Sequence, residues 1–210
     1  MNQPNFQRML EKELSEIARG DKVPTLLLHS CCAPCSSYVL EYLSDYFSIT
    51  VFYYNPNIYP REEYAMRVRE QQEFIRRFPA RYPISFVEGE YDTERFYRMA
   101  KGMEQEKEGG ARCLLCYELR LREAGALARR GHFDYFTTTL SISPLKNAGR
   151  LNEIGGQIGE EFGVHYLFSD FKKKNGYKRS TELSKEYGMY RQDYCGCIYS
   201  YQERHGLSCR

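Results

Sequence analysis

The chain has 210 residues, enough for one domain with a substantial core and too few for two independent enzymes. Hydrophobic residues make up 42% of it and charged residues 28%, which excludes an integral membrane protein and an intrinsically disordered chain. Because 30 lysines and arginines oppose 28 acidic residues, the net charge of +2 gives no global attraction for nucleic acid, and any anion site must be local.

Targeting signals are missing from the N-terminal sequence. Residues 1–20 are charged throughout and lack the apolar centre of a secretory signal, and no segment approaches the roughly 20 apolar residues of a membrane span. We therefore expect a cytoplasmic protein with no membrane partner. In a reducing cytosol, the eight cysteines are more typical of metal binding or redox chemistry than of structural disulfides.

Hydrophobic periodicity divides the chain into alternating helices and strands. Helices are predicted for Phe6–Ile17, around Tyr38–Leu43, for Glu62–Arg77, Asp92–Lys101, from near Cys113, and for Ala148–Phe162 and Thr181–Tyr187. Strands are predicted for Thr25–His29, Ser48–Tyr54, Ile84–Val87, Phe133–Leu140 and His165–Phe168. Because parallel strands need helical crossovers, this alternation favours an α/β fold with a mostly parallel sheet and helices on both faces. We expect one catalytic domain over residues 1–210, in which residues 171–210 are a lightly structured C-terminal extension.

Seven of the eight cysteines fall into three tight groups. They are Cys31, Cys32 and Cys35 in CCAPC, Cys113 and Cys116 in CLLC, and Cys195 and Cys197 in CGC, while Cys209 stands alone. The first group follows the first predicted strand, at the edge of the sheet where open α/β folds bind ligands. The second lies at a predicted helix start, where both thiols face one way and gain from the positive end of the helix dipole.

These cysteines have three interpretations: small core residues, ligands of a structural zinc ion, or ligands of an iron–sulfur cluster beside a separate dithiol. We prefer the last, because four zinc ligands leave three cysteines unexplained. The preferred allocation gives Cys31, Cys32, Cys113 and Cys116 to the cluster and makes Cys195 and Cys197 a redox-active pair. Gly196 supplies the backbone freedom that a short, strained and easily reduced disulfide ring requires. Cys35 stays open as an alternative cluster ligand or a ligand of a second metal.

Long ordered motifs extend over most of the chain. They are HSCCAPCS at 29–36, YNPNIYPREEY at 54–64, RCLLCYELRL at 112–121, FTTTLSISPLKN at 136–147 and DFKKKNGYKRSTELSKEYGMYRQDYCGCIYS at 170–200. Together they resemble the QueH family of epoxyqueuosine reductases. The resemblance implies that the protein removes the epoxide oxygen of epoxyqueuosine in the tRNA anticodon loop, which gives queuosine in the last step of its biosynthesis.

Cofactors and fold are also implied by this resemblance. It implies a 4Fe-4S cluster, in some members an additional mononuclear iron, and no cobalamin. The implied fold is related to the PP-loop and adenine nucleotide hydrolase group. The CCAPC loop lacks the glycine-rich pattern that cradles phosphate in that group, so ATP use is not expected.

A basic segment in the C-terminal extension is the candidate tRNA-binding surface. Its cations are Lys172, Lys173, Lys174, Lys178 and Arg179, interleaved with Phe171 and Tyr177. Cations attract phosphates and aromatic rings stack on unpaired bases, so we expect this segment to contact the tRNA. The electron donor is not identified by the sequence. The rival hypothesis is a zinc-stabilised RNA-binding module without redox activity, which would use the same thiolates and the same cations.

Opening an epoxide also requires a proton donor. The candidates beside the cysteines in sequence are Tyr117, Tyr190, Asp193 and Tyr194. Lys146 and Asn147, at the end of the fourth predicted strand, either bind phosphate or the modified base, or begin the next helix.

Overall fold

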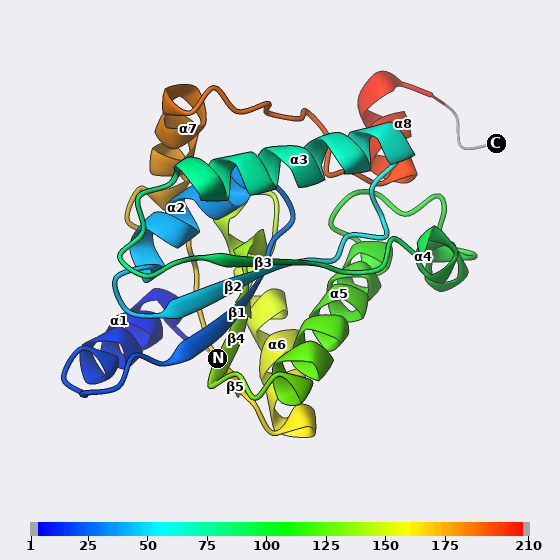
Figure 1. Cartoon of the computed structure of the whole chain (residues 1–210). Helices are drawn as coiled ribbons and strands as arrows, with labels where there is room; N and C mark the ends of the chain where they lie inside the picture. Colours follow the sequence, from blue (N-terminus) through cyan, green and yellow to red (C-terminus); the bar gives the residue numbers. More distant parts are fainter. Residues whose placement is uncertain (1–3, 208–210) are drawn as a thin grey trace.

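One five-stranded parallel sheet organises the molecule (Figure 1). The computed structural model describes residues 4–207, so Cys209 lies outside the described residues. The strands are β1 (Thr25–His29), β2 (Ser48–Tyr53), β3 (Ser85–Glu88), β4 (Tyr135–Thr138) and β5 (His165–Tyr166), in the order β3-β2-β1-β4-β5. The predicted α/β fold with a parallel sheet is confirmed.

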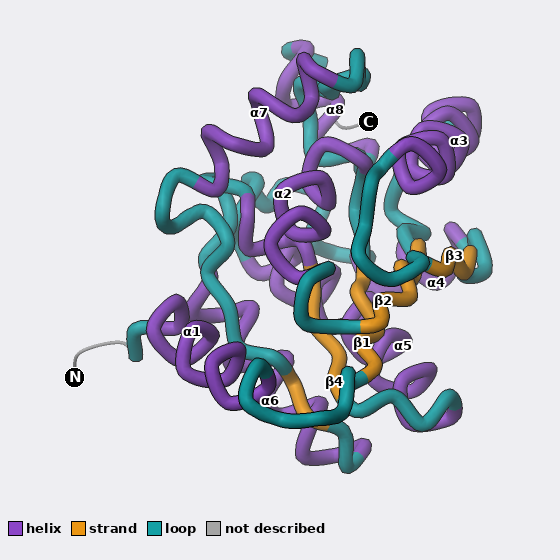
Figure 2. Tube along the Cα trace, turned by 60° about the vertical axis from the view of Figure 1, so that its left-hand side comes forward, coloured by secondary structure: helices purple, strands orange, loops and turns teal. Residues whose placement is uncertain are grey.

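Helices cover both faces of the sheet (Figures 1 and 2). In the described part of the chain they are α1 (Phe6–Ile17), α2 (Ala33–Leu43), α3 (Arg61–Arg77), α4 (Thr93–Ala100), α5 (Ala111–Arg130), α6 (Ala148–Phe162), α7 (Gly176–Glu186) and α8 (Ile198–His205). Leu26 and Leu28 of β1 belong to the core with α1, α2 and α3, whereas Leu27 belongs to the core with α5 and α6. Successive residues of the central strand thus enter opposite cores, because side chains alternate along a strand.

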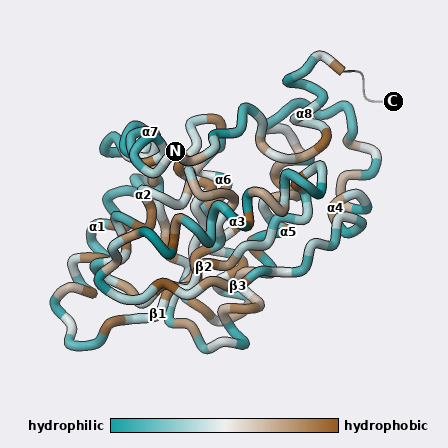
Figure 3. Tube along the Cα trace, turned by 45° about the horizontal axis from the view of Figure 1, so that its top comes forward, coloured by the Kyte–Doolittle hydropathy of each residue, from teal (hydrophilic) through white to brown (hydrophobic). Residues whose placement is uncertain are grey.

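Local sequence signals explain most of the element boundaries. Asn5, Asp92 and Asn147 each accept a hydrogen bond from the backbone N–H three residues later and so begin α1, α4 and α6. Gly163 ends α6 in the left-handed conformation, with φ 65°, as the sequence predicted. Figure 3 shows the apolar segments concentrated in the sheet and polar residues on outer helices such as α7.

The C-terminal extension is more structured than the sequence predicted. Helix α7 begins at Gly176 rather than Thr181, and α8 follows the CGC motif where no helix was expected. In α7 the side chains of Ser180 and Ser184 are among those buried, so its inner face does not show an apolar period. Gly176 is required at the start of α7, because a Cβ there would lie 2.0 Å from the carbonyl oxygen of Phe171.

Strands β4 and β5 are shorter than predicted. After β4 the chain turns into a 3-10 helix, Thr139–Ile142, whose start is fixed by the Thr138 hydroxyl accepting a hydrogen bond from the Leu140 N–H. Hydroxyl side chains compete in this way with the backbone hydrogen bonds of a sheet. This competition explains why β4 ends at Thr138, although the apolar sequence continues beyond it. None of the helices within residues 4–207 has the length and apolar character to cross a membrane.

Candidate metal and redox site

The first cysteine group lies at the carboxyl edge of the sheet, between β1 and β4. The connections from these two strands lead to opposite sides of the sheet, which creates the crevice where such folds bind ligands. Cys32 begins α2 directly after β1, and Pro34 occupies its first turn. The Cys31 N–H donates to the hydroxyl of Thr139, which follows β4, over 3.3 Å. The position that the sequence predicted for this group is therefore correct.

The thiols of Cys31, Cys32 and Cys35 form one compact group. Their sulfur atoms lie within 4.8 Å of one another, and the Nε2 of Gln192 donates to the Cys32 sulfur over 3.2 Å. Hydrogen bonds from the thiols of Cys32 and Cys35 lower the pKa of Cys31 well below its ordinary value. The same interactions raise the pKa of Cys35. The group therefore stabilises one thiolate and has the ligand atoms to hold a metal ion.

The second and third cysteine groups surround a small neighbouring cavity. Cys113 and Cys116 in the first turns of α5 line it together with Cys195 and Cys197. Burial raises the pKa of Cys113, and it raises the pKa of Cys116 to about 11 and that of Cys197 to about 12. We expected the helix dipole to favour thiolates at Cys113 and Cys116, but the effect of burial is larger. All seven of these cysteines are free thiols in the structure.

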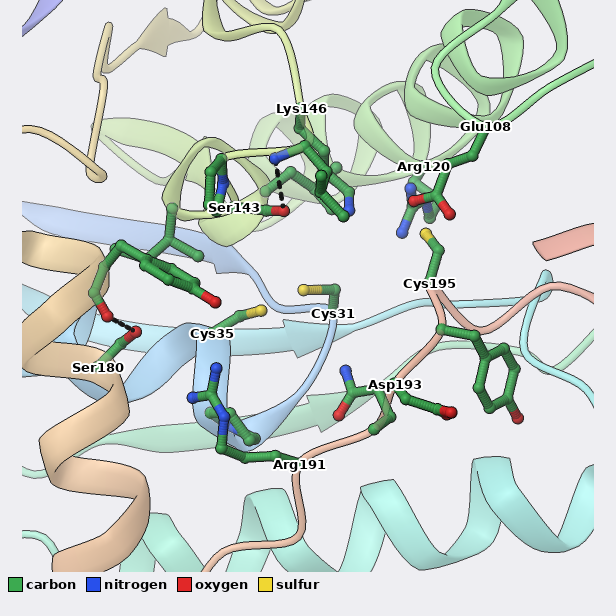
Figure 4. Close-up of a pocket in the computed structure, with 18 residues that line it drawn as sticks. Cys31, Cys35, Glu108, Arg120, Ser143, Lys146, Ser180, Arg191, Asp193 and Cys195 are labelled. Atoms are coloured by element: carbon green, nitrogen blue, oxygen red, sulfur yellow. Dashed lines mark hydrogen bonds between the residues drawn. The ribbon is translucent and has the colours of Figure 1, made fainter. Parts of the chain in front are cut away.

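A larger cavity of about 320 Å³ joins the two thiol groups (Figure 4). The thiols of Cys31 and Cys35 line it from one side and the thiol of Cys195 lines it from another. The side chains of Arg120 and Lys146 also line this cavity. Burial disfavours the Lys146 ammonium, but the negative charges of nearby groups, Cys195 first, outweigh burial and raise its pKa. The cavity therefore combines redox-capable sulfur with the half-buried Lys146 cation, an environment suited to an oxygen atom that gains negative charge.

The loop after β2 holds the cysteine groups in position. The Tyr59 N–H donates to the carbonyl of Gly196 over 2.8 Å, and the Tyr194 hydroxyl donates to the carbonyl of Tyr59 over 2.6 Å. At the other end of the loop, the Asn55 side chain donates to the carbonyl of Ser30 over 2.8 Å. Gly196 has φ 128°, a conformation that favours glycine, so the CGC motif depends on this residue for its path.

The predicted cluster ligands are divided between two groups of thiols. Cys31 and Cys32 lie in the compact group with Cys35, while Cys113 and Cys116 lie outside that 4.8 Å group and share a cavity with Cys195 and Cys197. Cys31 and Cys113 nevertheless belong to the same packed core around α5. The allocation of Cys31, Cys32, Cys113 and Cys116 to one cluster stays a prediction.

The basic segment lies beside a second, wider cavity of about 710 Å³. Lys172, Lys173 and Lys174 line it with Arg8, and Lys146 lines both this cavity and the thiol cavity. Several of the cations are paired with acids: Lys172 with Asp170, Lys174 with Glu11, Lys178 with Glu182 and Arg179 with Glu41. The role of the segment in tRNA binding stays a prediction.

Buried polar atoms around the thiols lack partners. Within residues 4–207 these are Asn57 Oδ1, Arg67 Nη2, Gln71 Nε2, Arg112 Nε and Arg120 Nη2. Four of the five are N–H donors, and a buried donor without an acceptor is costly. Thiolate and sulfide are acceptors, so the surroundings of these cysteines fit an anionic metal–sulfur group.

Sequence reasoning missed the arginines of this site. Arg120 follows Cys113 by seven residues and Cys116 by four, so the spacing alone places it on the same face of a helix. That spacing was the signal that could have identified it. For Arg67 and Gln71 the sequence signal of a buried position was weaker, because polar residues on a highly charged helix such as α3 are normally exposed.

Comparisons with known proteins agree with one another. The family model described as "Epoxyqueuosine reductase QueH" matches residues 26–203. A protein named epoxyqueuosine reductase QueH from Staphylococcus epidermidis is 42% identical, and the alignment covers 93% of this chain and 84% of the relative. A protein of the same name from Streptococcus pyogenes is 41% identical, over 93% of this chain and 78% of the relative. The relative of the same name from Thermotoga maritima is 37% identical over 86% of this chain and 92% of its own length.

Proposed function

Because the chain belongs to the epoxyqueuosine reductase QueH family, we propose that it reduces epoxyqueuosine in tRNA to queuosine by removing the epoxide oxygen. It is an oxidoreductase of queuosine biosynthesis. The observation that carries this function is the cavity in which Cys31 and Cys35 of the CCAPC segment lie with Cys195 of the CGC segment and with Lys146. A two-electron reduction needs electron-donating groups and a proton source at one place, and this cavity holds both.

We further propose a 4Fe-4S cluster on Cys31, Cys32, Cys113 and Cys116. Cys35 is then either an alternative ligand or a ligand of an additional mononuclear iron. The unpartnered buried donors support an anionic group of this kind. We also propose, as the family resemblance implies, that the reaction uses no cobalamin. These cysteines would hold the cluster, and the chemistry that it would supply is one-electron transfer.

The dithiol of Cys195 and Cys197 can supply the two electrons and two protons that the reduction consumes. Its oxidation to a disulfide releases two electrons and two protons. The epoxide takes up both, its two carbon–oxygen bonds break, a carbon–carbon double bond forms and the oxygen leaves as water. The Lys146 ammonium lines the same cavity and hydrogen-bonds the oxygen as negative charge develops on it. An external electron donor then reduces the disulfide for the next turnover.

The tRNA carrying epoxyqueuosine binds across the basic segment, where Lys172, Lys173, Lys174, Lys178 and Arg179 contact phosphates. The wider cavity supports this path, because Lys146 joins it to the thiol cavity. A tRNA substrate places the reaction in the cytoplasm.

Anaerobic purification with iron and sulfide quantitation tests this function first. We expect about four irons and four sulfides per chain and a signal that dithionite reduces, followed by turnover of epoxyqueuosine-containing tRNA. Zinc without sulfide after anaerobic reconstitution would instead favour an RNA-binding module. In the same assay Cys31→Ser and Cys113→Ser should lose the cluster. A Cys31→Ser protein that keeps a full cluster contradicts the ligand allocation.

A further inference from the structure

Arg120 is a buried cation whose hydrogen-bond partners are all neutral. Only 1% of its surface is exposed. Its Nε donates to the carbonyl of Cys116 over 3.2 Å, its Nη1 donates to the amide oxygen of Asn55 over 3.3 Å, and its Nη2 has no partner. A buried guanidinium in this condition is costly unless negative charge lies close by.

Arg67 differs from Arg120 because it has an acidic partner. Arg67 is equally buried, but its Nε donates to the carboxylate of Glu63 over 2.7 Å. For Arg120 the negative charges that oppose the effect of burial and raise its pKa come from Cys116, Cys195 and Cys31. The groups that can compensate its charge are thus sulfur atoms, one from each cysteine group, and they do so only when they are ionised or bound to a metal.

Arg120 also lies where those groups meet. It lines both the larger cavity, with Cys31, Cys35 and Cys195, and the small one, with Cys113 and Cys116. Figure 4 shows its guanidinium directed toward the Cys195 thiol. Whichever four cysteines bind the cluster, the charge of Arg120 acts on it through buried, poorly screening protein.

We propose that Arg120 is a positioning residue that raises the reduction potential of the iron–sulfur centre. A cluster with four thiolate ligands is anionic and becomes more negative when it accepts an electron, so a nearby buried cation stabilises the reduced form. The inference rests on the proposed function, because it requires that the cysteines hold such a cluster. It adds a residue outside the thiol ligands to the electron-transfer chemistry.

The test is a redox titration of the anaerobically reconstituted protein, followed by absorbance and EPR. Arg120→Gln keeps an amide for the two neutral partners and removes the charge. We expect it to shift the one-electron equilibrium at least tenfold toward the oxidised form, which is about 59 mV more negative. Arg120→Lys, which keeps the charge, should stay nearer the parent. Arg122→Gln is the matched control, because Arg122 lies on the same helix but is exposed and ion-paired with Glu161, and it should not change the potential.

An unchanged potential in an iron-loaded Arg120→Gln protein overturns the proposal. Thermal unfolding of the metal-free proteins gives an independent result if that variant holds too little iron. Without the anionic cluster Arg120 is an uncompensated cation, so metal-free Arg120→Gln should melt close to the metal-free parent. A melting temperature far below that parent would mean that the arginine has a structural role, and would also overturn the proposal. A parent chain that binds no iron overturns the proposed function itself, and so the two failures are distinguishable.

Discussion

Lys146 lies between the thiol cavity and the basic cavity. It lines the thiol cavity on one side and the basic cavity on the other, immediately before the N-cap residue of α6. The sequence left open whether Lys146 binds the substrate or only begins a helix. In the structure Asn147 caps α6 through its side chain and Lys146 lines both cavities, so the cap is confirmed for Asn147 and substrate binding by Lys146 stays a prediction.

Replacing Lys146 tests its role beside the substrate oxygen. Lys146→Met should lower the single-turnover rate of epoxide reduction about 100-fold, the low end of the range for losing one hydrogen-bond donor to a developing oxyanion, while the iron content stays at parent level. Lys146→Arg should keep part of the rate because it keeps the charge. Rapid-quench assays with epoxyqueuosine-containing tRNA measure the rate, and a parent-like rate for Lys146→Met would remove the residue from the chemistry.

At the scale of elements, the contact of α6 with β5 depends on the absence of a side chain. A Cβ at Gly155 would lie 2.2 Å from the ring of Tyr166, which is buried between the helix and the sheet. Gly155→Ala should therefore destabilise the fold by about 2 kcal/mol through overpacking, after the gain in helix propensity is included. Denaturant unfolding measures this change.

Gly156 is the matched control for this contact. A Cβ there would lie 3.1 Å from the edge of the half-buried Phe168 ring, so a small shift of that ring can accommodate it. Gly156→Ala should cost less than about 0.5 kcal/mol or stabilise the protein. Equal effects at both positions would contradict the packing argument.

Asp134 connects the starts of β1 and β4. Its carboxylate accepts a hydrogen bond from the Thr25 N–H over 2.8 Å and pairs with Lys22, and these interactions hold the pKa of Asp134 below its ordinary 3.8. Because the folded-state pKa is the lower one, the stabilisation is present above 3.8 and is lost as the pH falls through the folded value.

We therefore expect Asp134→Asn to cost about 1 kcal/mol at pH 7, since a third of the side chain is exposed, and progressively less as the pH falls below 3.8. Urea unfolding at several pH values measures the difference from the parent. Asp21→Asn, at an exposed neighbouring position, is the control. A cost that does not change with pH would show that the charge of Asp134 contributes little.

At the scale of the whole molecule, the parts of the fold that the sequence predicted are those with local signals. β1 was predicted with its observed bounds because a central strand buried on both faces is a continuous apolar run. α7 and α8 were missed or misplaced because their buried faces are set by tertiary contacts of serine and glycine. The cysteine groups were predicted from their spacing. The loop from Asn55 to Tyr59 was predicted as a loop, but its contacts with the cysteine segments were not, because those partners lie far away in sequence. The buried arginines were missed although Arg120 shares a helix face with Cys113 and Cys116.

Charge distribution sets the last prediction. The chain has a net charge of only +2, so tRNA affinity must come from a local surface. Within the basic segment, Lys172 and Lys174 are paired with Asp170 and Glu11, whereas Lys173 makes no ion pair within residues 4–207. Lys173 therefore offers its charge to a phosphate without first losing an internal partner.

Lys173→Glu should weaken tRNA binding and reduce the slope of log affinity against log salt by about 1, as expected for the loss of one phosphate contact. The triple variant with glutamate at 172, 173 and 174 should reduce the slope further. Arg76→Glu is the control, because Arg76 is exposed on α3 outside the two large cavities. Titrations with labelled tRNA at several salt concentrations give the slopes. Parent-like slopes for the triple variant would exclude the basic segment as the tRNA-binding surface. The proposed chemistry in the thiol cavity would still stand, and the next candidate contact would be Arg191, which also lines that cavity.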